Sequence, residues 1–512
     1  MHCMKVTTFH LFLSLGMLLF ANTKTAAQST LVQTKYGQIE GSSEENIRIY
    51  QSIPFAAPPL GALRWKAPQS PASWTDVKKC TAFSASPIQP KPVPFLCWSV
   101  EFIAPPEPLS EDCLYLNVWT GASSAKEKRP VFVWIYGGGF TSGSAACAIY
   151  DGKEYAKRGI VFVSINYRVG AFGFMASPDL TKEGNGSSGN YGLMDQVAAL
   201  KWVNENIAAF GGDPENVTIA GQSAGSMSVN ALIASPAAKG LFQRAIMESG
   251  GLLGGIKTAS LEDGEKAGVL LQDKMGAKTI AEMRAMPADS VLKISQGLGN
   301  LRFAPIRDGI FLPVDLEKTF SEKKFNQVDL LSGWVTGDGA LFGVAKTTPE
   351  AFVKMIHETY GSKADGLLRL VPHETAEQAS ASQMELTMIS FGFLSPYKIS
   401  LYNSKPVYLY EFSHVPVAKP NFPDYGAFHT SEVPYALHNL HEWNRPWQPA
   451  DLALEDKMSS YWINFIKSGN PNGPNLVPWE NSHSSFTLEF GDRIEGKKNL
   501  YKNIAETLAG KE

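Results

Sequence analysis

The sequence predicts an α/β fold with a mostly parallel central sheet and helices on both of its faces. Short apolar runs rich in β-branched residues recur along the chain, which is typical of strands buried on both faces. Between these runs, apolar residues recur at three- and four-residue steps, which is the spacing of one face of a helix. Strands and helices that alternate in this way favour parallel strands joined by crossover helices.

The individual elements follow from the same patterns. The expected strands are residues 131–136, 160–166, 217–220, 244–247, 328–334 and 406–412. The clearest helix covers residues 193–210, and two more are expected at 226–234 and 458–466. No repeat period and no long Gly/Ser linker divides the chain, so we expect no domain boundary after the N-terminal segment.

Composition places the chain among large globular proteins. Of its 512 residues, 44% are hydrophobic and 19% are charged, which excludes a disordered chain, a collagen-like repeat and a small disulfide scaffold. The formal net charge is −3, without a basic block, so no nucleic-acid partner is expected. Nothing in the sequence indicates an obligate protein partner.

The N-terminus predicts a secretory signal. Lys5 precedes an apolar run at residues 11–21, and the small residues Thr25, Ala26 and Ala27 indicate cleavage near Ala27. The run is well short of the ~20 residues that span a bilayer, and no later stretch is long and apolar enough. We therefore expect residues 1–27 to be a signal peptide, the protein to be secreted or periplasmic, and the mature chain to have no membrane span.

Four cysteines follow the signal segment: Cys80, Cys97, Cys113 and Cys147. An even number in an oxidising compartment permits disulfides. A bridge from Cys113 to Cys80 or Cys97 would close the Pro-rich segment 87–108. We expect one disulfide that ends at Cys113, with its partner open, rather than four free thiols.

The strongest chemical motif is residues 221–225 (GQSAG), which follows the strand at 217–220 and precedes the helix at 226–234. A serine at such a tight strand-to-helix turn sits in strained backbone and projects above the sheet, with a helix N-terminus facing the reacting carbonyl. The pattern G-x-S-x-G alone is weak, but here strand, turn and helix coincide. The sequence therefore predicts Ser223 as a nucleophile.

A glycine run upstream predicts donors for an oxyanion. Gly137, Gly138 and Gly139 follow the strand at 131–136, and glycines let backbone N–H groups approach a substrate closely. The carboxyl end of an inner strand is also where α/β sheets place ligands. We expect the N–H groups of Gly138, Gly139 and Ala224 to form an oxyanion hole.

A serine nucleophile needs a base and an acid that orients the base. In this kind of fold the chain order is nucleophile, acid, histidine. His429 lies on a loop after the strand at 406–412 and fits the base, with His414 as its competitor. Asp338 follows the strand at 328–334 and fits the acid, and Asp308 is the runner-up.

Two weaker patterns resemble a cofactor site and a metal site, but neither has the expected context, so we expect no cofactor and no metal. Residues 184–189 (GNGSSG) match the dinucleotide fingerprint, but they do not follow a predicted strand. His438, His441 and Glu442 lie close together in sequence, but no zinc-binding motif accompanies them.

Several motifs together resemble the type B carboxylesterase/lipase family, the cholinesterase-like α/β-hydrolases. They are residues 110–117 (SEDCLYLN), 136–140 (YGGGF), 166–168 (NYR), 210–214 (FGGDP) and 221–225 (GQSAG). The likeness runs from about residue 37 to about residue 479. It implies an α/β-hydrolase fold with large loop and helical insertions over the active site, and one type B carboxylesterase domain at 28–512.

The resemblance also implies a role for each site residue. Ser223 would be the acyl nucleophile, His429 the base and Asp338 its charge partner, with Gly138, Gly139 and Ala224 as the oxyanion hole. Three residues that support the site are implied as well: Gln222, directly before the nucleophile, Ser249, at the family's serine position, and Glu432, three residues after His429. The implied activity is hydrolysis of small-molecule carboxylic esters.

Three departures from the family pattern matter. The acid is Asp338 where the family usually has Glu, which keeps the charge but shortens the side chain. Gln222 replaces the usual Glu before the nucleophile, and no tryptophan matches the choline-site position before Cys113; both changes favour neutral or anionic esters over choline esters. Pro87 stands where the usual partner of Cys113 would be.

Two alternatives to a small-molecule esterase come from the same fold. One is a catalytically silent adhesion or binding protein, which typically lacks the nucleophile; here Ser223, Asp338 and His429 are all present. The other keeps the triad and acts on an amide or a polymer-linked ester. We expect the segment 87–108 to wall the substrate gorge, where the sequence leaves specificity open.

Overall fold

The computed structural model describes residues 29–255, 257–299, 301–341, 343, 346–419, 423–482 and 485–510. The signal peptide expected at 1–27 lies outside these residues. Within them, no helix has the length and apolar character needed to cross a bilayer.

An eleven-stranded sheet runs through this part of the chain, in the order β18-β17-β16-β15-β12-β11-β9-β10-β8-β4-β3. Every pair from β10 to β17 is parallel, and the outer pairs at both edges are antiparallel. The strands are β3 (Ser42–Glu44), β4 (Ile47–Pro54), β8 (Tyr115–Thr120), β9 (Arg129–Ile135), β10 (Val161–Ile165), β11 (Gly212–Gln222), β12 (Arg244–Glu248), β15 (Asp329–Val335), β16 (Val407–Phe412), β17 (Phe486–Phe490) and β18 (Ile494–Lys498).

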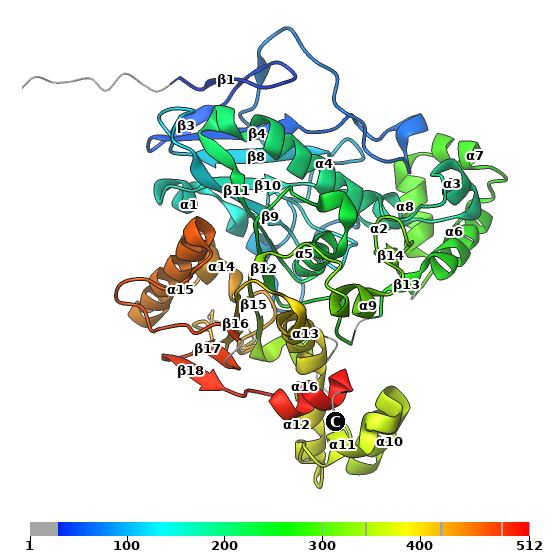
Figure 1. The fold of residues 1–512 in the computed structure, drawn as a ribbon. Coiled ribbons are helices and arrows are strands. Elements are labelled where there is room, and N and C mark those ends of the chain that lie inside the picture. The colour runs from blue at the N-terminus through cyan, green and yellow to red at the C-terminus, as the bar shows by residue number, and fades with distance from the viewer. Residues whose placement is uncertain are drawn as a thin grey trace, which may run out of the picture.

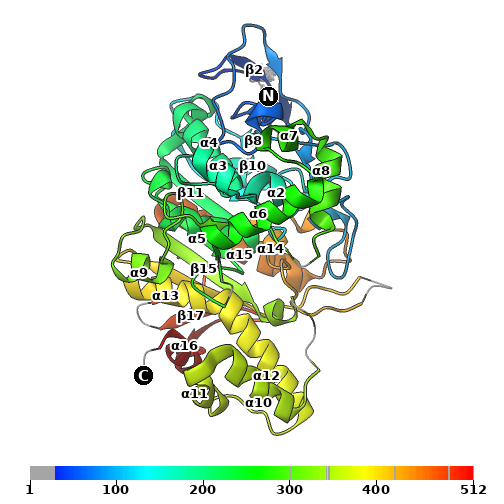
Figure 2. The ribbon, with the colours of Figure 1, turned by 90° about the vertical axis from the view of Figure 1, so that its right-hand side faces the viewer.

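Helices cover both faces of this sheet (Figures 1 and 2). On one face α4 and α5 pack against β11, and on the other α1 and α15 pack against β10, β9 and β11. The bounds are α1 (Lys153–Lys157), α2 (Gly170–Phe174), α3 (Pro178–Glu183), α4 (Tyr191–Asn206), α5 (Ala224–Ala234), α9 (Leu316–Ser321), α14 (Val433–Leu437), α15 (Pro449–Ser468) and α16 (Lys502–Ala509). The predicted fold class, a mostly parallel sheet flanked by helices, is therefore confirmed.

Two helical insertions extend beyond the sheet. One, between β12 and β15, carries α6 (Leu261–Met275), α7 (Ile280–Ala285) and α8 (Ala288–Gln296). The other, between β15 and β16, carries α10 (Pro349–Tyr360), α11 (Ala364–Leu368), α12 (Ala376–Met388) and α13 (Leu394–Tyr402), and in Figure 1 α10–α12 project from the lower end of the molecule. Short strands complete the elements: β1 (Leu31–Gln33), β2 (Gln38–Glu40), β5 (Lys78–Lys79), β6 (Ser86–Pro87), β7 (Leu109–Ser110), β13 (Ala259–Ser260) and β14 (Ile306–Arg307).

The six strands predicted from apolar runs are β9, β10, β11, β12, β15 and β16. β11 begins at Gly212 rather than at 217, and its pairing with β9 shifts register between Gly212 and Val217. Polar residues before the apolar run hid this extension. The helix predicted at 193–210 is α4 followed by a 3₁₀ turn at Ile207–Phe210, and α15 begins at Pro449, well before the predicted 458.

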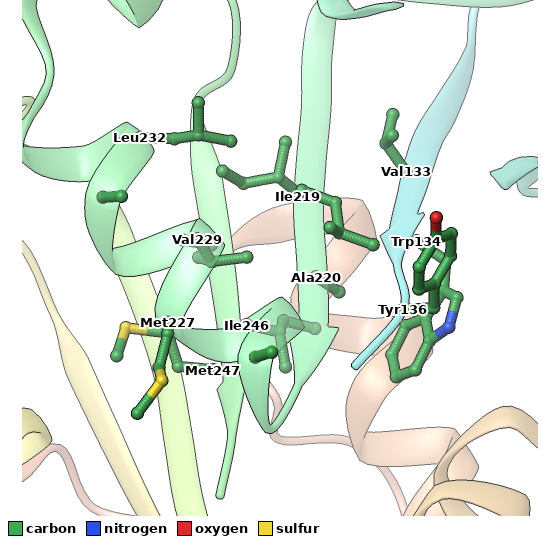
Figure 3. Close-up of a cluster of buried hydrophobic side chains, with 14 of the residues drawn as sticks. Val133, Trp134, Tyr136, Ile219, Ala220, Met227, Val229, Leu232, Ile246 and Met247 are labelled. Carbon is green, nitrogen blue, oxygen red and sulfur yellow. The ribbon is translucent and has the colours of Figure 1, made fainter. Parts of the chain in front are cut away.

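The centre of the core lies between the inner strands and α5. Figure 3 shows Ile219 and Ala220 of β11 between Val133 of β9 and Ile246 of β12, with Val229 and Leu232 of α5 against them. All six side chains are fully buried. Burial of apolar side chains stabilises a fold by ~25 cal/mol per Å² of surface removed from water. This cluster therefore holds in place the end of β11, which directly precedes Ser223.

Two buried ion pairs each include one residue of the motifs at 110–117 and 166–168, Glu111 and Arg168. Arg64 binds Glu111 through two bonds of 2.7 and 2.5 Å, and Arg168 binds Asp195 through two bonds of 2.8 and 2.7 Å. All four side chains are buried. Such charges are tolerated in a core when they are paired with good geometry, so these motif residues hold loops rather than substrate.

The expected disulfide at Cys113 is wrong for this structure. Cys80, Cys97, Cys113 and Cys147 are all free thiols. Pro87, at the position where the family resemblance implies the partner of Cys113, lines the same small cavity as Cys113 and has no sulfur. The Cys80 thiol instead lies 3.9 Å from the carbonyl oxygen of Ser52.

Candidate active site

The turn between β11 and α5 has the strained shape that the motif predicts. Ser223 has φ 59° and ψ −122°, a conformation that L-residues rarely adopt. A Cβ on Gly225 would lie 2.1 Å from the carbonyl oxygen of Ile135, and one on Gly221 would lie 2.5 Å from the backbone of Gly225. Only glycine fits at these two positions, so the helix approaches the sheet closely and Ser223 is left half-buried at its edge.

The glycine run borders this serine. A Cβ on Gly137 would lie 3.1 Å from the Cβ of Ser223. Gly138 and Gly139 have φ 99° and 62°, and both are exposed. Among the described residues no hydrogen bond uses the N–H of either glycine, and Ala224 stands at the first position of α5. The N–H groups of these three residues are therefore free to donate hydrogen bonds, as an oxyanion site requires.

His429 and Asp338 form a buried pair close to the elbow. His429 Nδ1 lies 2.6 Å from Asp338 Oδ1, and the two side chains are 5% and 0% exposed. The second carboxylate oxygen, Oδ2, accepts from the N–H of Val335 at 3.1 Å. The Gly337 N–H donates to the carbonyl of Ala427 at 2.9 Å, so backbone joins the acid loop to the histidine loop. The shorter aspartate therefore still reaches the imidazole.

Three side chains surround the imidazole ring, and sequence reasoning missed two of them. Gln222 Nε2 lies 3.2 Å from His429 Nε2 and 3.4 Å from Nδ1. The Trp98 and Phe391 rings approach at centroid distances of 6.3 and 5.5 Å. Trp98 lies within the segment 87–108, and its position in that segment was the only signal for it. It does not match the family's choline-site spacing, but its ring contacts the ring of His429, the candidate base.

In the described part of the chain, the candidate nucleophile Ser223 and the candidate base His429 are not joined by a hydrogen bond. Among the described residues His429 Nδ1 binds Asp338, Gln222 Nε2 lies within 3.4 Å of both ring nitrogens, and no hydrogen bond reaches Ser223 Oγ. Such bonds are often long in substrate-free enzymes and shorten when substrate binds.

Two more acids lie buried beneath the pair. The Ser223 N–H donates to the carbonyl of Glu248 at 2.8 Å, and Ser249 Oγ donates to Glu432 Oε1 at 3.3 Å. Burial raises the pKa of Glu248 to about 8, against a hydrogen bond from Trp462 Nε1 that lowers it. Burial, and then the charge of Glu248, raises the pKa of Glu432 well above its usual range. Burial therefore favours the protonated form of both side chains over the charged form.

The runner-up residues have other partners. Asp308 accepts from the N–H groups of Phe311 and Leu312 at 3.0 and 2.8 Å and so closes a turn. His414 binds Asp451, and His438 contacts Arg158. The described residues contain no group of three His, Cys, Asp or Glu side chains that could hold a metal.

The model of the carboxylesterase family matches residues 28–506.

The chain belongs to the carboxylesterase family.

Among relatives, the para-nitrobenzyl esterase of Bacillus subtilis is 35% identical over 93% of this chain and 99% of its own. The fumonisin B1 esterase of Sphingopyxis macrogoltabida is 33% identical over 91% of this chain and 87% of its own. A solved carboxylesterase of Geobacillus stearothermophilus superposes with a TM-score of 0.82 at 29% identity, over 94% of this chain and all of that one. As a member of this family, the chain is a carboxylic ester hydrolase.

Proposed function

We propose that this protein is a serine carboxylesterase that works through an acyl-enzyme on Ser223. The observation that carries the proposal is the buried 2.6 Å contact between His429 and Asp338, beside a strained serine that borders a glycine run with unused N–H groups. These are the parts that acyl transfer requires: a nucleophile, an oriented base and oxyanion donors.

In the proposed reaction Ser223 Oγ attacks the ester carbonyl while its proton passes to His429 Nε2. Asp338 stabilises the imidazolium that forms, because its carboxylate accepts from Nδ1. The N–H groups of Gly138, Gly139 and Ala224 stabilise the oxyanion. His429 then protonates the departing alcohol, and the same imidazole activates a water that releases the acid.

The first test is a Ser223→Ala variant with p-nitrophenyl acetate as substrate. We expect turnover to fall by about 10⁵-fold or more, and an organophosphonate to label Ser223 of the wild type in a one-to-one ratio. Full turnover by the variant, or a label on another residue, would rule out the proposed nucleophile.

For substrates we propose neutral or anionic esters over choline esters. The neutral side chain of Gln222 supports this, since it places no fixed charge beside the nucleophile. The test compares butyrylcholine with the 3,3-dimethylbutyl ester of butyric acid, which replaces the charged nitrogen by carbon. We expect a higher kcat/KM for the neutral ester, and the reverse order would contradict the proposal. An anilide of the same acid tests the amide alternative.

We further propose one catalytic domain at 28–512 that is exported after removal of residues 1–27. The match of the family model to residues 28–506 supports the boundary. N-terminal sequencing of the protein from its native host tests it, with a new terminus near residue 28 expected and an intact Met1 as the contrary result.

A further inference from the structure

A chain of three side chains links the segment 87–108 to the candidate base. Trp98 Nε1 donates to Thr430 Oγ1 at 3.1 Å. Thr430 Oγ1 in turn donates to Gln222 Oε1 at 3.4 Å. The other end of the same amide, Gln222 Nε2, faces the ring of His429. Gln222 and Thr430 are buried, so water does not compete freely for these groups.

The direction of this chain follows from its first member. An indole N–H can only donate, so Thr430 Oγ1 accepts from Trp98. Its own proton is then available for Gln222, and only the amide oxygen can accept it. Because Thr430 Oγ1 contacts Gln222 Oε1 at 3.4 Å, the nitrogen of Gln222 is the end that faces His429.

The position of this nitrogen leaves the base free to act. The distances from Gln222 Nε2 to the two ring nitrogens differ by little, 3.2 against 3.4 Å. An atom in line with the Nε2 lone pair would be much farther from Nδ1 than from Nε2. The amide nitrogen thus lies over the face of the ring, and the lone pair stays available for the proton of Ser223.

An amide N–H over the ring also affects its charge. The positive end of the N–H dipole favours neutral imidazole over imidazolium, whereas an oxygen at the same place would favour the cation. Only neutral imidazole accepts the proton of Ser223.

We propose that Trp98 is a positioning residue for His429: through Thr430 it fixes the amide of Gln222 so that nitrogen, and not oxygen, faces the imidazole. This rests on the proposed serine mechanism. In this proposal the segment 87–108 contributes to catalysis through Trp98. The amide of Gln222, at a position where the resemblance implies glutamate, keeps the imidazole neutral.

Other charged groups near His429 stay in place in the test variants. Asp338 contacts Nδ1 from the loop after β15, Glu248 lies on β12, and Glu432 precedes α14. Arg445 stacks on Phe428, next to His429, at 5.9 Å. Because none of these groups is changed, a shift in pH dependence reports on the Trp98–Thr430–Gln222 chain.

The experiment measures kcat/KM for p-nitrophenyl acetate against pH in the wild type and in Trp98→Phe, Thr430→Val, Thr430→Ser and Gln222→Glu. In Gln222→Glu a carboxylate faces the ring, and we expect the acid limb to move up by about one pH unit or more. Trp98→Phe and Thr430→Val should move it in the same direction by less, since the amide is then free to turn. Thr430→Ser keeps the hydroxyl and should match the wild type.

Acid limbs that stay at the wild-type position in both Trp98→Phe and Thr430→Val would overturn the proposal, as would a shift in Thr430→Ser as large as in Thr430→Val. Thr430→Val preserves shape and backbone preference, so it tests the chain even if Trp98→Phe loses packing. Organophosphonate labelling separates the two proposals. A wild type labelled at Ser223 with unmoved limbs in the variants removes only the role of Trp98, and a wild type labelled elsewhere removes the serine mechanism itself.

Discussion

Two histidines that follow β16, His414 and His429, each pair with a buried aspartate, but the two pairs have different neighbours. His429 binds Asp338 at 2.6 Å, and His414 binds Asp451 at 2.9 Å. All four side chains are at most 10% exposed. Burial and pairing are thus nearly the same in the two pairs.

Their surroundings differ. Asp451 also accepts from Tyr435 Oη at 2.7 Å and from the N–H of Gln448 at 3.0 Å, so the His414 pair anchors α14 and the start of α15. In the other pair, the His429 ring contacts the side-chain amide of Gln222, the residue directly before Ser223. The pairing with a carboxylate therefore does not by itself make a histidine a candidate base. The histidine also needs a ring nitrogen that faces a candidate nucleophile.

The largest expected effect separates the two histidines. His429→Ala should lower kcat by about 10⁵-fold or more, because the base is lost. His414→Ala should leave kcat within a few-fold and instead lower the free energy of unfolding by about 2 kcal/mol, because Asp451 loses a buried partner. Steady-state kinetics and thermal melts of both variants measure this. Similar losses of kcat in His429→Ala and His414→Ala would contradict the assignment of His429 alone as the base.

The two aspartates should differ in the same way. Asp338→Asn should lower kcat by about 10⁴-fold, because the amide favours the wrong imidazole tautomer, while Asp451→Asn should mainly lower the melting temperature. Asp308→Asn serves as a further control, since Asp308 closes a turn. A kcat loss in Asp308→Asn, with Asp338→Asn active, would move the acid assignment to Asp308.

The smallest effect concerns the acids beneath the His429 pair. Because burial raises the pKa of folded Glu248 to about 8, its contribution to stability is complete below the ordinary glutamate pKa and is lost as pH rises toward 8. Glu248→Gln does not titrate. The free energy of unfolding of Glu248→Gln relative to the wild type should therefore rise between about pH 5 and pH 9, by on the order of 1–3 kcal/mol. Thermal melts at a series of pH values measure this difference.

Glu262→Gln is the matched control, since the Glu262 side chain is 77% exposed and should give no such trend. A difference between Glu248→Gln and wild type that stays constant across this pH range would show that Glu248 titrates like an ordinary glutamate in the folded protein.

The sheet could be predicted because each inner strand contains a short run of mostly apolar residues, and the glycines at 221 and 225 marked the turn that carries Ser223. Asp338 and His429 could be placed because both follow such strands. Trp98 and Thr430 could not be linked, because their contact joins two loops without periodicity that are far apart in the sequence. The disulfide prediction failed because an even number of cysteines carries no information about distances between them.

The bond from the Gly337 N–H to the carbonyl of Ala427 has a consequence for how this enzyme can be altered. It closes the chain between Asp338 and His429 into a loop whose two ends are fixed side by side, with α10–α13 as its outer part. Helices in that part can be exchanged for those of a relative while β16 and the two anchor residues are kept. Phe391, between α12 and α13, contacts the His429 ring at a centroid distance of 5.5 Å, so an exchange that keeps this residue would also keep the surroundings of the imidazole.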